Sequence, residues 1–119
     1  MTYAKNILSG STDGRGIKVV ATASAGTTIH TGPSLATSLD EVWLYAVNSS
    51  ASAVKLTVQW GGTTDPDDSI EYTVPSEDGL KLIIPGNIIK GNASPLVVRA
   101  FAATGNVILI HGFVNQITI

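Results

Sequence analysis

The sequence contains no cysteine, which excludes two kinds of site. Without cysteine the chain can form neither a disulfide framework nor a thiolate metal site, and its composition is compatible with folding in a reducing cytoplasm. Charged residues are also scarce, at 13% of the chain against roughly 25% in ordinary soluble domains. The net charge is −2, so the basic footprint of a nucleic-acid-binding protein is missing and we expect no nucleic-acid partner.

Long apolar segments are missing as well. No stretch approaches the roughly 18 consecutive apolar residues of a membrane-spanning helix, and residues 1–5 lack the apolar core of a signal peptide. We therefore expect a protein that is made in a cytoplasm and has no membrane partner. No helical periodicity extends beyond one or two turns, so the fold must be built from strands.

The clearest strand signal lies in the middle of the chain. Residues 54–60 alternate strictly between apolar and polar side chains, which is typical of a strand with one buried face. Residues 42–47 are apolar on both faces, so we expect their second face to need a cover beyond a single sandwich core. The polar segment 48–52 between them predicts a turn, and therefore a central hairpin.

Further segments with the same signals predict strands at 17–23, 27–31, 70–74, 80–84, 96–102 and 107–114. Residues 104–106 between the last two predict a hairpin turn. The total is seven or eight strands in a single domain over residues 17–119. This pattern predicts an all-β fold, an antiparallel β-sandwich of jelly-roll-like type.

Residues 1–16 are polar and glycine-rich, and they predict a flexible N-terminal arm. Two interpretations of this segment remain open. It is either a frayed terminus or an arm that docks on an adjacent subunit, with Tyr3, Ile7 and Leu8 as its anchors.

The residue types used in catalysis or metal binding do not form a motif. The acidic loop 65–71 offers oxygen ligands to Ca²⁺, but it lacks the spacing of a calcium loop, and solvated carboxylates are the favoured interpretation. His30 and His111 are far apart in the sequence, and no Gly-x-Ser-x-Gly elbow is present. We expect both histidines to be hydrogen-bonded within strands, and we expect no enzyme activity, no metal site and no cofactor.

Aromatic residues on the strands allow two interpretations, a core role or a platform on which sugar rings stack, and the core role is favoured. They are Trp43, Tyr45, Trp60, Tyr72 and Phe101. Arg99 stands on an otherwise apolar strand, which suggests a deliberate contact. We expect it to pair with Glu41 or Glu71, or across a subunit boundary.

Four phrases of strand sequence carry a resemblance to a known class of proteins. They are Asp40–Asn48, Leu56–Gly62, Leu82–Gly86 and Val107–Asn115. Together they resemble small structural proteins of tailed bacteriophage virions, most closely the capsid decoration, or cement, proteins. The resemblance covers about residues 17–117.

The resemblance implies a β-rich protein that sits on the capsid surface of the virion and ties neighbouring subunits together, with no shared catalytic residues. The implied partners are the major capsid protein and further copies of this chain, as a homotrimer. A tail, neck or fibre-associated structural protein and a carbohydrate-binding module of the receptor-binding apparatus remain alternatives. The residues expected at a subunit or capsid interface are Tyr3, Ile7, Leu8, Trp43, Tyr45, Arg99 and Phe113.

Overall fold

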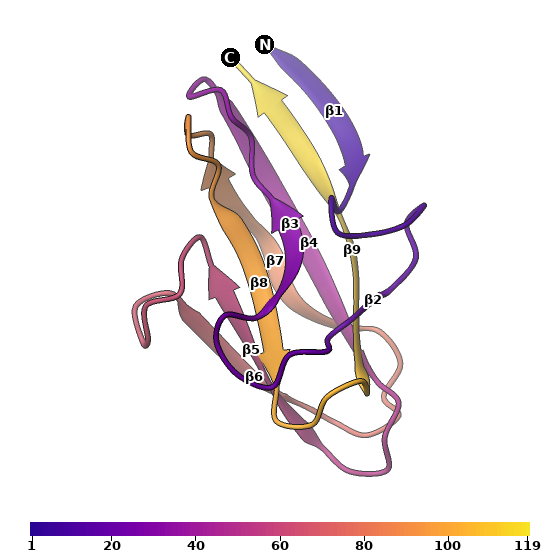
Figure 1. The fold of residues 1–119 in the computed structure, drawn as a ribbon. Coiled ribbons are helices and arrows are strands. Elements are labelled where there is room, and N and C mark those ends of the chain that lie inside the picture. The colour runs from indigo at the N-terminus through magenta and orange to yellow at the C-terminus, as the bar shows by residue number, and fades with distance from the viewer.

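The chain folds into two antiparallel β-sheets that pack face to face, without any helix (Figure 1). The computed structural model describes all 119 residues. The predicted all-β sandwich is confirmed, with nine strands in place of seven or eight. In chain order they are β1 Thr2–Ile7, β2 Ile17–Lys18, β3 Thr27–Thr31, β4 Ser38–Asn48, β5 Val54–Trp60, β6 Ser69–Val74, β7 Lys81–Lys90, β8 Val97–Ala102 and β9 Ile108–Thr118.

The order of the strands is that of a jelly roll. Sheet A has five strands in the order β1–β9–β4–β7, with the short β2 also paired to β9, and sheet B has four in the order β3–β8–β5–β6. Strands β2 to β9 therefore form two four-stranded rows, β2–β9–β4–β7 and β3–β8–β5–β6, as in an eight-stranded jelly roll. The extra strand β1 lies beside β9, and the two termini lie side by side (Figure 1).

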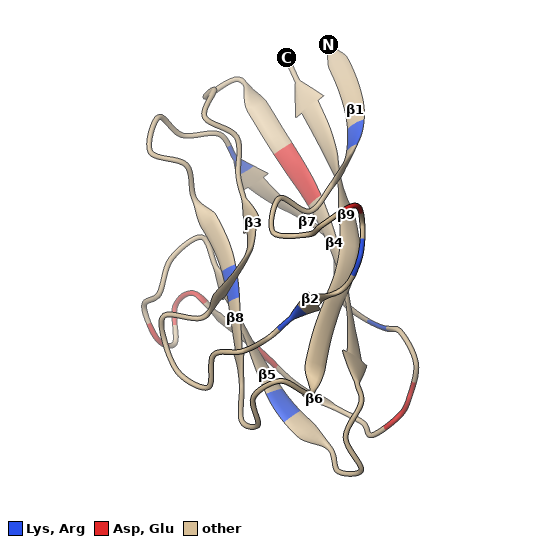
Figure 2. Ribbon diagram, turned by 45° about the vertical axis from the view of Figure 1, so that its right-hand side comes forward, with Lys and Arg blue, Asp and Glu red and all other residues tan.

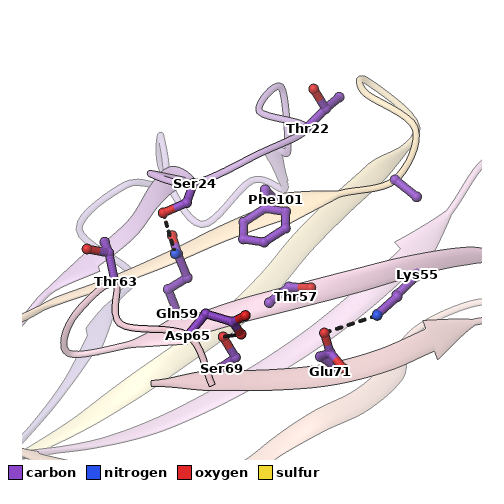
Figure 3. A pocket seen from close by; sticks show the side chains of 11 residues that line it. Thr22, Ser24, Lys55, Thr57, Gln59, Thr63, Asp65, Ser69, Glu71 and Phe101 are labelled. Atoms are coloured by element: carbon purple, nitrogen blue, oxygen red, sulfur yellow. Dashed lines mark hydrogen bonds and ion pairs between the residues drawn. The ribbon is translucent and has the colours of Figure 1, made fainter. Parts of the chain in front are cut away.

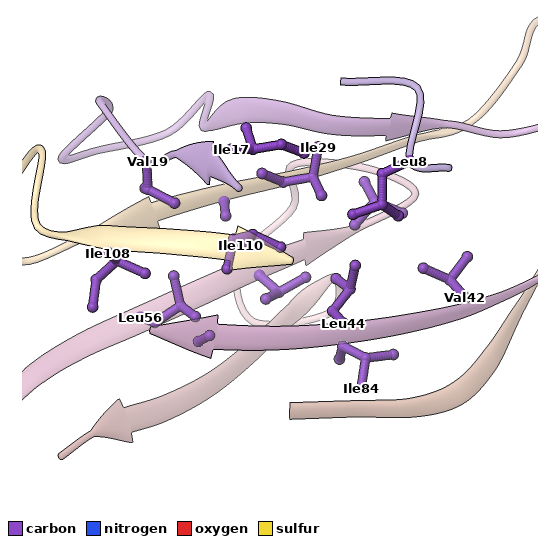
Figure 4. Close-up of a cluster of buried hydrophobic side chains, with 14 of the residues drawn as sticks. Leu8, Ile17, Val19, Ile29, Val42, Leu44, Leu56, Ile84, Ile108 and Ile110 are labelled. Carbon is purple, nitrogen blue, oxygen red and sulfur yellow. The ribbon is translucent and has the colours of Figure 1, made fainter. Parts of the chain in front are cut away.

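The hydrophobic core fills the space between the sheets, and side chains from both sheets point into it (Figure 4). Alternation along β4 explains how it forms: Val42, Leu44 and Ala46 are fully buried, while the residues between them are partly exposed on the outside. Strand β5 supplies Leu56 and Val58 from the opposite sheet. Burying one such side chain stabilises the fold by about 1.5–3 kcal/mol, so the core is the main source of stability.

The two predicted hairpins are wrong. Strands β4 and β5 lie in different sheets, as do β8 and β9, so the turns at 48–52 and 104–106 cross between sheets. Asn48 holds the first crossing in place, because its buried Nδ2 donates to the carbonyl oxygens of Ser52 at 2.9 Å and Val74 at 3.0 Å. Sequence distance alone does not distinguish a turn within one sheet from a turn between two.

Several strand boundaries also differ from the prediction. The segment 17–23 is paired only at Ile17–Lys18, and the tail beyond residue 114 belongs to β9. Strand β7 continues through Pro85 to Lys90, although the strand was predicted only over residues 80–84. Proline is tolerated there because β7 is an edge strand, and the register shifts on both sides of the Trp43–Pro85 pair.

The prediction of a flexible arm over residues 1–16 is wrong for the first half of this segment. Thr2–Ile7 form β1, paired with β9 from Thr118 to Phe113. Leu8 is only 1% exposed and lies in the core of its own chain, so it cannot anchor a neighbouring subunit in this arrangement. The Gly10 amide then donates to the Ile29 carbonyl at 2.9 Å, which fastens this segment to sheet B.

Candidate functional site

The outer face of sheet A, the side turned away from the core, is largely apolar and no second layer of this chain covers it. Strand alternation and register place side chains from four strands on it. Four of its large apolar side chains are exposed: Tyr3 at 68%, Ile7 at 51%, Leu82 at 43% and Ile88 at 50%. Further apolar side chains of this face are partly exposed, and they are Leu39, Trp43, Tyr45, Val47, Leu109, Phe113 and Ile117.

Aromatic contacts order the middle of this face. Trp43 on β4 and Phe113 on β9 are register partners, and their rings stack with centroids 6.0 Å apart and planes 9° apart. Lys5 Nζ lies 4.7 Å from the centre of the Phe113 ring, which is a cation–π contact. These contacts therefore hold the rings in one orientation.

Glu41 places a negative charge beside these rings. Its Oε1 accepts hydrogen bonds of 2.9 Å from Trp43 Nε1 and of 2.9 Å from Asn115 Nδ2. These two hydrogen bonds hold the pKa of Glu41 below its ordinary value, and the bond from Trp43 has the larger effect. Glu41 and Lys5 thus place one charge of each sign beside the aromatic pair, and the strand register puts Lys18 and Lys90 on the same face.

Of the seven residues expected at an interface, five share this face: Tyr3, Ile7, Trp43, Tyr45 and Phe113. Leu8 is in the core, and Arg99 lies on β8 in the other sheet. The ion pairs expected for Arg99 within the chain are absent, because Glu71 pairs with Lys55 at 3.0 Å and Glu41 bonds Trp43 and Asn115. The outward surface of sheet B therefore keeps one unpaired guanidinium.

The histidines occupy different environments. His30 is 5% exposed; its Nε2 lies 2.6 Å from Asp40 Oδ2, and its Nδ1 accepts from the Ser9 amide at 3.0 Å. The expected hydrogen-bonded strand histidine is confirmed here. Because both side chains are buried, this pair meets no substrate. His111 lies on the outer face of sheet A beside Gly16, and its imidazole makes no hydrogen bond within the chain.

Two carboxylates of the acidic loop accept hydrogen bonds from residues of the same loop or its end. Asp68 Oδ2 accepts from the Thr64 amide at 3.0 Å, and Asp65 Oδ1 accepts from Ser69 Oγ at 3.0 Å. No three histidine, cysteine or acidic residues of the chain gather as metal ligands. These contacts shape the loop that follows β5.

The structure also contains a groove that the sequence did not reveal. Thr57 and Gln59 were expected on the wet face of β5, yet they are only 4% and 3% exposed. Connections β2–β3 and β5–β6 rise over them and enclose a groove, called here the sheet B groove (Figure 3). It is lined by Thr22, Ser24, Lys55, Thr57, Gln59, Thr63, Asp65, Ser69, Glu71, Phe101 and Ala103.

The aromatic residues divide between three places. Trp60 and Tyr72 pack against the core, as the core interpretation expects. Trp43 and Tyr45 lie on the outer face of sheet A, and Phe101 lines the sheet B groove. The polar face of β5, beside the single aromatic residue of β8, is the sequence signal that could have located the floor of the groove. This signal does not show which loops cover that floor.

Comparison with known proteins found no matching family model, no similar curated protein and no similar solved structure. The chain contains no helix that is long and apolar enough to span a membrane. The outer face of sheet A and the sheet B groove are the two surface features that suggest a function.

Proposed function

We propose that this chain is a structural protein of a phage virion, without catalytic activity, which binds the outside of an assembled capsid and cements neighbouring major capsid subunits. The observation that carries the proposal is the apolar outer face of sheet A. Soluble monomers rarely leave an apolar patch of more than a few hundred Å² exposed unless it binds a partner. The resemblance of the strand phrases to capsid decoration proteins supports the same choice of partner.

Shape and charge favour a protein surface as the occupant of this face. The two longer dimensions of the chain, 45 and 27 Å, frame a sheet broad enough for the roughly 800 Å² that each partner buries in a standard interface. Charged residues are few, at 13% of the chain, and both signs occur on the molecule (Figure 2). Glu41 and Lys5 supply one charge of each sign, which can orient a docked partner. By fold-level analogy alone, jelly rolls are frequent among capsid proteins.

Replacement of Trp43 by alanine tests the docking face. We expect the variant to bind assembled heads roughly tenfold more weakly or worse, because a tryptophan at the centre of an interface is a typical hot spot. The measurement is cosedimentation of the purified chain with heads that lack it, with circular dichroism to confirm the fold. Phe113→Ala, which removes the stacked partner ring, is expected to behave alike.

Leu35→Ala is the matched control, since Leu35 is 61% exposed but lies in the connection between β3 and β4. Its binding to heads should equal that of the unchanged chain. Unaltered binding by both Trp43→Ala and Phe113→Ala would remove the outer face of sheet A from the proposal. Recovery of the protein with purified tails, and not with heads, would favour the tail or neck alternative.

The proposal includes self-association as a homotrimer, in which β1 contacts a neighbouring copy. Support comes from the low charge of the chain and from β1, whose six residues are all exposed at the edge of sheet A. Light scattering of the isolated chain should give three times its 12.3 kDa mass, and deletion of Thr2–Ile7 should give a monomer. A monomeric intact chain at high concentration would contradict this part of the proposal.

A further inference from the structure

The sheet B groove has the dimensions of a small ligand site. Its volume is about 280 Å³, close to the lower end of the range of about 300–1,000 Å³ for small-molecule pockets. Strands β5, β6 and β8 form its floor, and the connections β2–β3 and β5–β6 form its walls (Figure 3). Segments far apart in the sequence thus enclose one recess.

Hydrogen bonds within the chain hold the groove open. Gln59 Nε2 donates to Ser24 Oγ at 2.9 Å, and Gln59 Oε1 accepts from the Gly26 amide at 2.8 Å, which ties the floor to one wall. On the other side Lys55 Nζ lies 3.0 Å from Glu71 Oε2. The recess is therefore preorganised, which reduces the entropy cost of binding.

Among the residues that line the groove, Thr57 gives the strongest indication of a ligand. The residue is only 4% exposed, yet its hydroxyl lines the groove and makes no hydrogen bond within the chain. Every side-chain polar atom that is fully buried in this protein has a hydrogen-bond partner. Because the Thr57 hydroxyl has none, it is not fully buried and opens into the recess. Polar groups in such positions normally have a partner, which here must come from outside the chain.

Other unused acceptors surround Thr57. Asp65 uses Oδ1 to accept from Ser69 and keeps Oδ2 free, while Glu71 meets Lys55 through Oε2 and keeps Oε1 free. Phe101 is the only aromatic residue of the groove, and its ring lies between the wall with Ser24 and the floor strands (Figure 3). Hydroxyl donors and acceptors thus surround one apolar ring.

We propose that the sheet B groove binds a neutral glycan, with one sugar ring against Phe101. Sugar hydroxyls both donate and accept, so they match the free oxygens of Thr57, Asp65 and Glu71, and the C–H face of the ring matches the aromatic surface. Phosphate, sulfate and acidic sugars are disfavoured because the recess has two carboxylates and a single lysine, Lys55. The groove lies on the sheet opposite the proposed docking face, so this inference does not depend on the proposed function.

The test is a titration of the ¹⁵N-labelled full chain, followed by amide chemical shifts, with neutral oligosaccharides of glucose, mannose, galactose, xylose and N-acetylglucosamine. At millimolar concentration at least one should cause saturable shifts confined to β5, β6, β8 and the two walls. Phe101→Ala should weaken that binding about tenfold, the effect of losing one aromatic stacking contact. Glu71→Gln, at an exposed position that the fold does not need, should weaken it roughly tenfold as well.

Phe113→Ala is the matched control, since it removes a phenyl ring from the opposite sheet and should leave glycan binding unchanged. The proposal is overturned if none of the five oligosaccharides binds, or if the shifts map to the outer face of sheet A. It is also overturned if both Phe101→Ala and Glu71→Gln bind like the unchanged chain. Tighter binding of a sulfated oligosaccharide than of its neutral counterpart would overturn the assignment to neutral glycans.

Discussion

Asp40→Ala is expected to lower the free energy of unfolding by about 3–5 kcal/mol, because it removes the shared acceptor of a buried polar network. Asp40 Oδ2 lies 2.6 Å from His30 Nε2, and Asp40 Oδ1 accepts from Gln116 Nε2 at 3.2 Å. Since His30 Nδ1 accepts from the Ser9 amide, Nε2 carries the proton and donates to Asp40. The substitution leaves the buried His30 donor and the partly buried Gln116 donor without their acceptor. Urea denaturation measures the loss.

The position of this network explains the size of the effect. His30 lies on β3 of sheet B, Asp40 and Gln116 lie on β4 and β9 of sheet A, and Ser9 belongs to the segment after β1. The network therefore joins both sheets to the N-terminal segment at one point. His30→Ala should be similarly damaging, and the double variant should lose less than the two single losses combined, as expected for residues that act together.

The control is Asp67→Ala, an exposed carboxylate of the β5–β6 connection that makes no ion pair. It should change stability by no more than about 0.5 kcal/mol. If Asp40→Ala unfolded at nearly the same urea concentration as Asp67→Ala, the network would be shown to contribute little.

The strands that could be predicted from the sequence are those in which apolar residues alternate with the buried face. The range of β5 was predicted as observed, and the two apolar faces of residues 42–47 correspond to the core side and the outer side of β4. The pairing of strands could not be predicted, since β4 and β5 each pair with strands distant in sequence. Strand β1 was missed because its residues are exposed, so that backbone pairing with β9, and not apolar alternation, determines its structure.

The candidate surfaces were predictable to different degrees. Trp43 and Tyr45 stand on a strand that is apolar on both faces, and such a strand must leave one apolar side outside the sandwich core. Phe101 and Thr57 gave no comparable signal, because the groove depends on loops from two other parts of the chain. For Arg99 only the partner within the chain was wrong, since residue type indicates that a guanidinium needs a partner but not where it lies; a partner across a subunit boundary stays a prediction.

The two surfaces lie on opposite sheets, and this arrangement has a consequence for the assembled protein. A jelly roll attached to a shell through sheet A would turn sheet B, with its groove, toward the surroundings. Docking and glycan binding would then not compete. The loops that build the groove would be free of the docking contact, and the aromatic stack of Trp43 and Phe113 would be covered by it.

Gly112→Ala is expected to lower the free energy of unfolding by about 3 kcal/mol through overpacking in the middle of sheet A. A Cβ at Gly112 would overlap the carbonyl oxygen of Trp43 and lie 3.2 Å from Leu44 Cα, and these atoms belong to backbone that cannot turn away. Gly112 and Leu44 are register partners at the centre of the β4–β9 pairing. The substitution should therefore also disturb the Trp43–Phe113 stack, which near-ultraviolet circular dichroism reports alongside urea denaturation.

Gly79→Ala separates this clash from the general cost of replacing glycine. Gly79 has φ +71°, and a Cβ added to it would meet no other atom within 4 Å, so alanine there should cost only about 1–2 kcal/mol for the left-handed backbone. Gly112→Ala should be the less stable variant and, because its aromatic stack is displaced, it should also bind heads more weakly. Equal stability of the two variants would mean that the β4–β9 pairing relaxes around a methyl group, and that the backbone beneath the docking face is not a rigid platform.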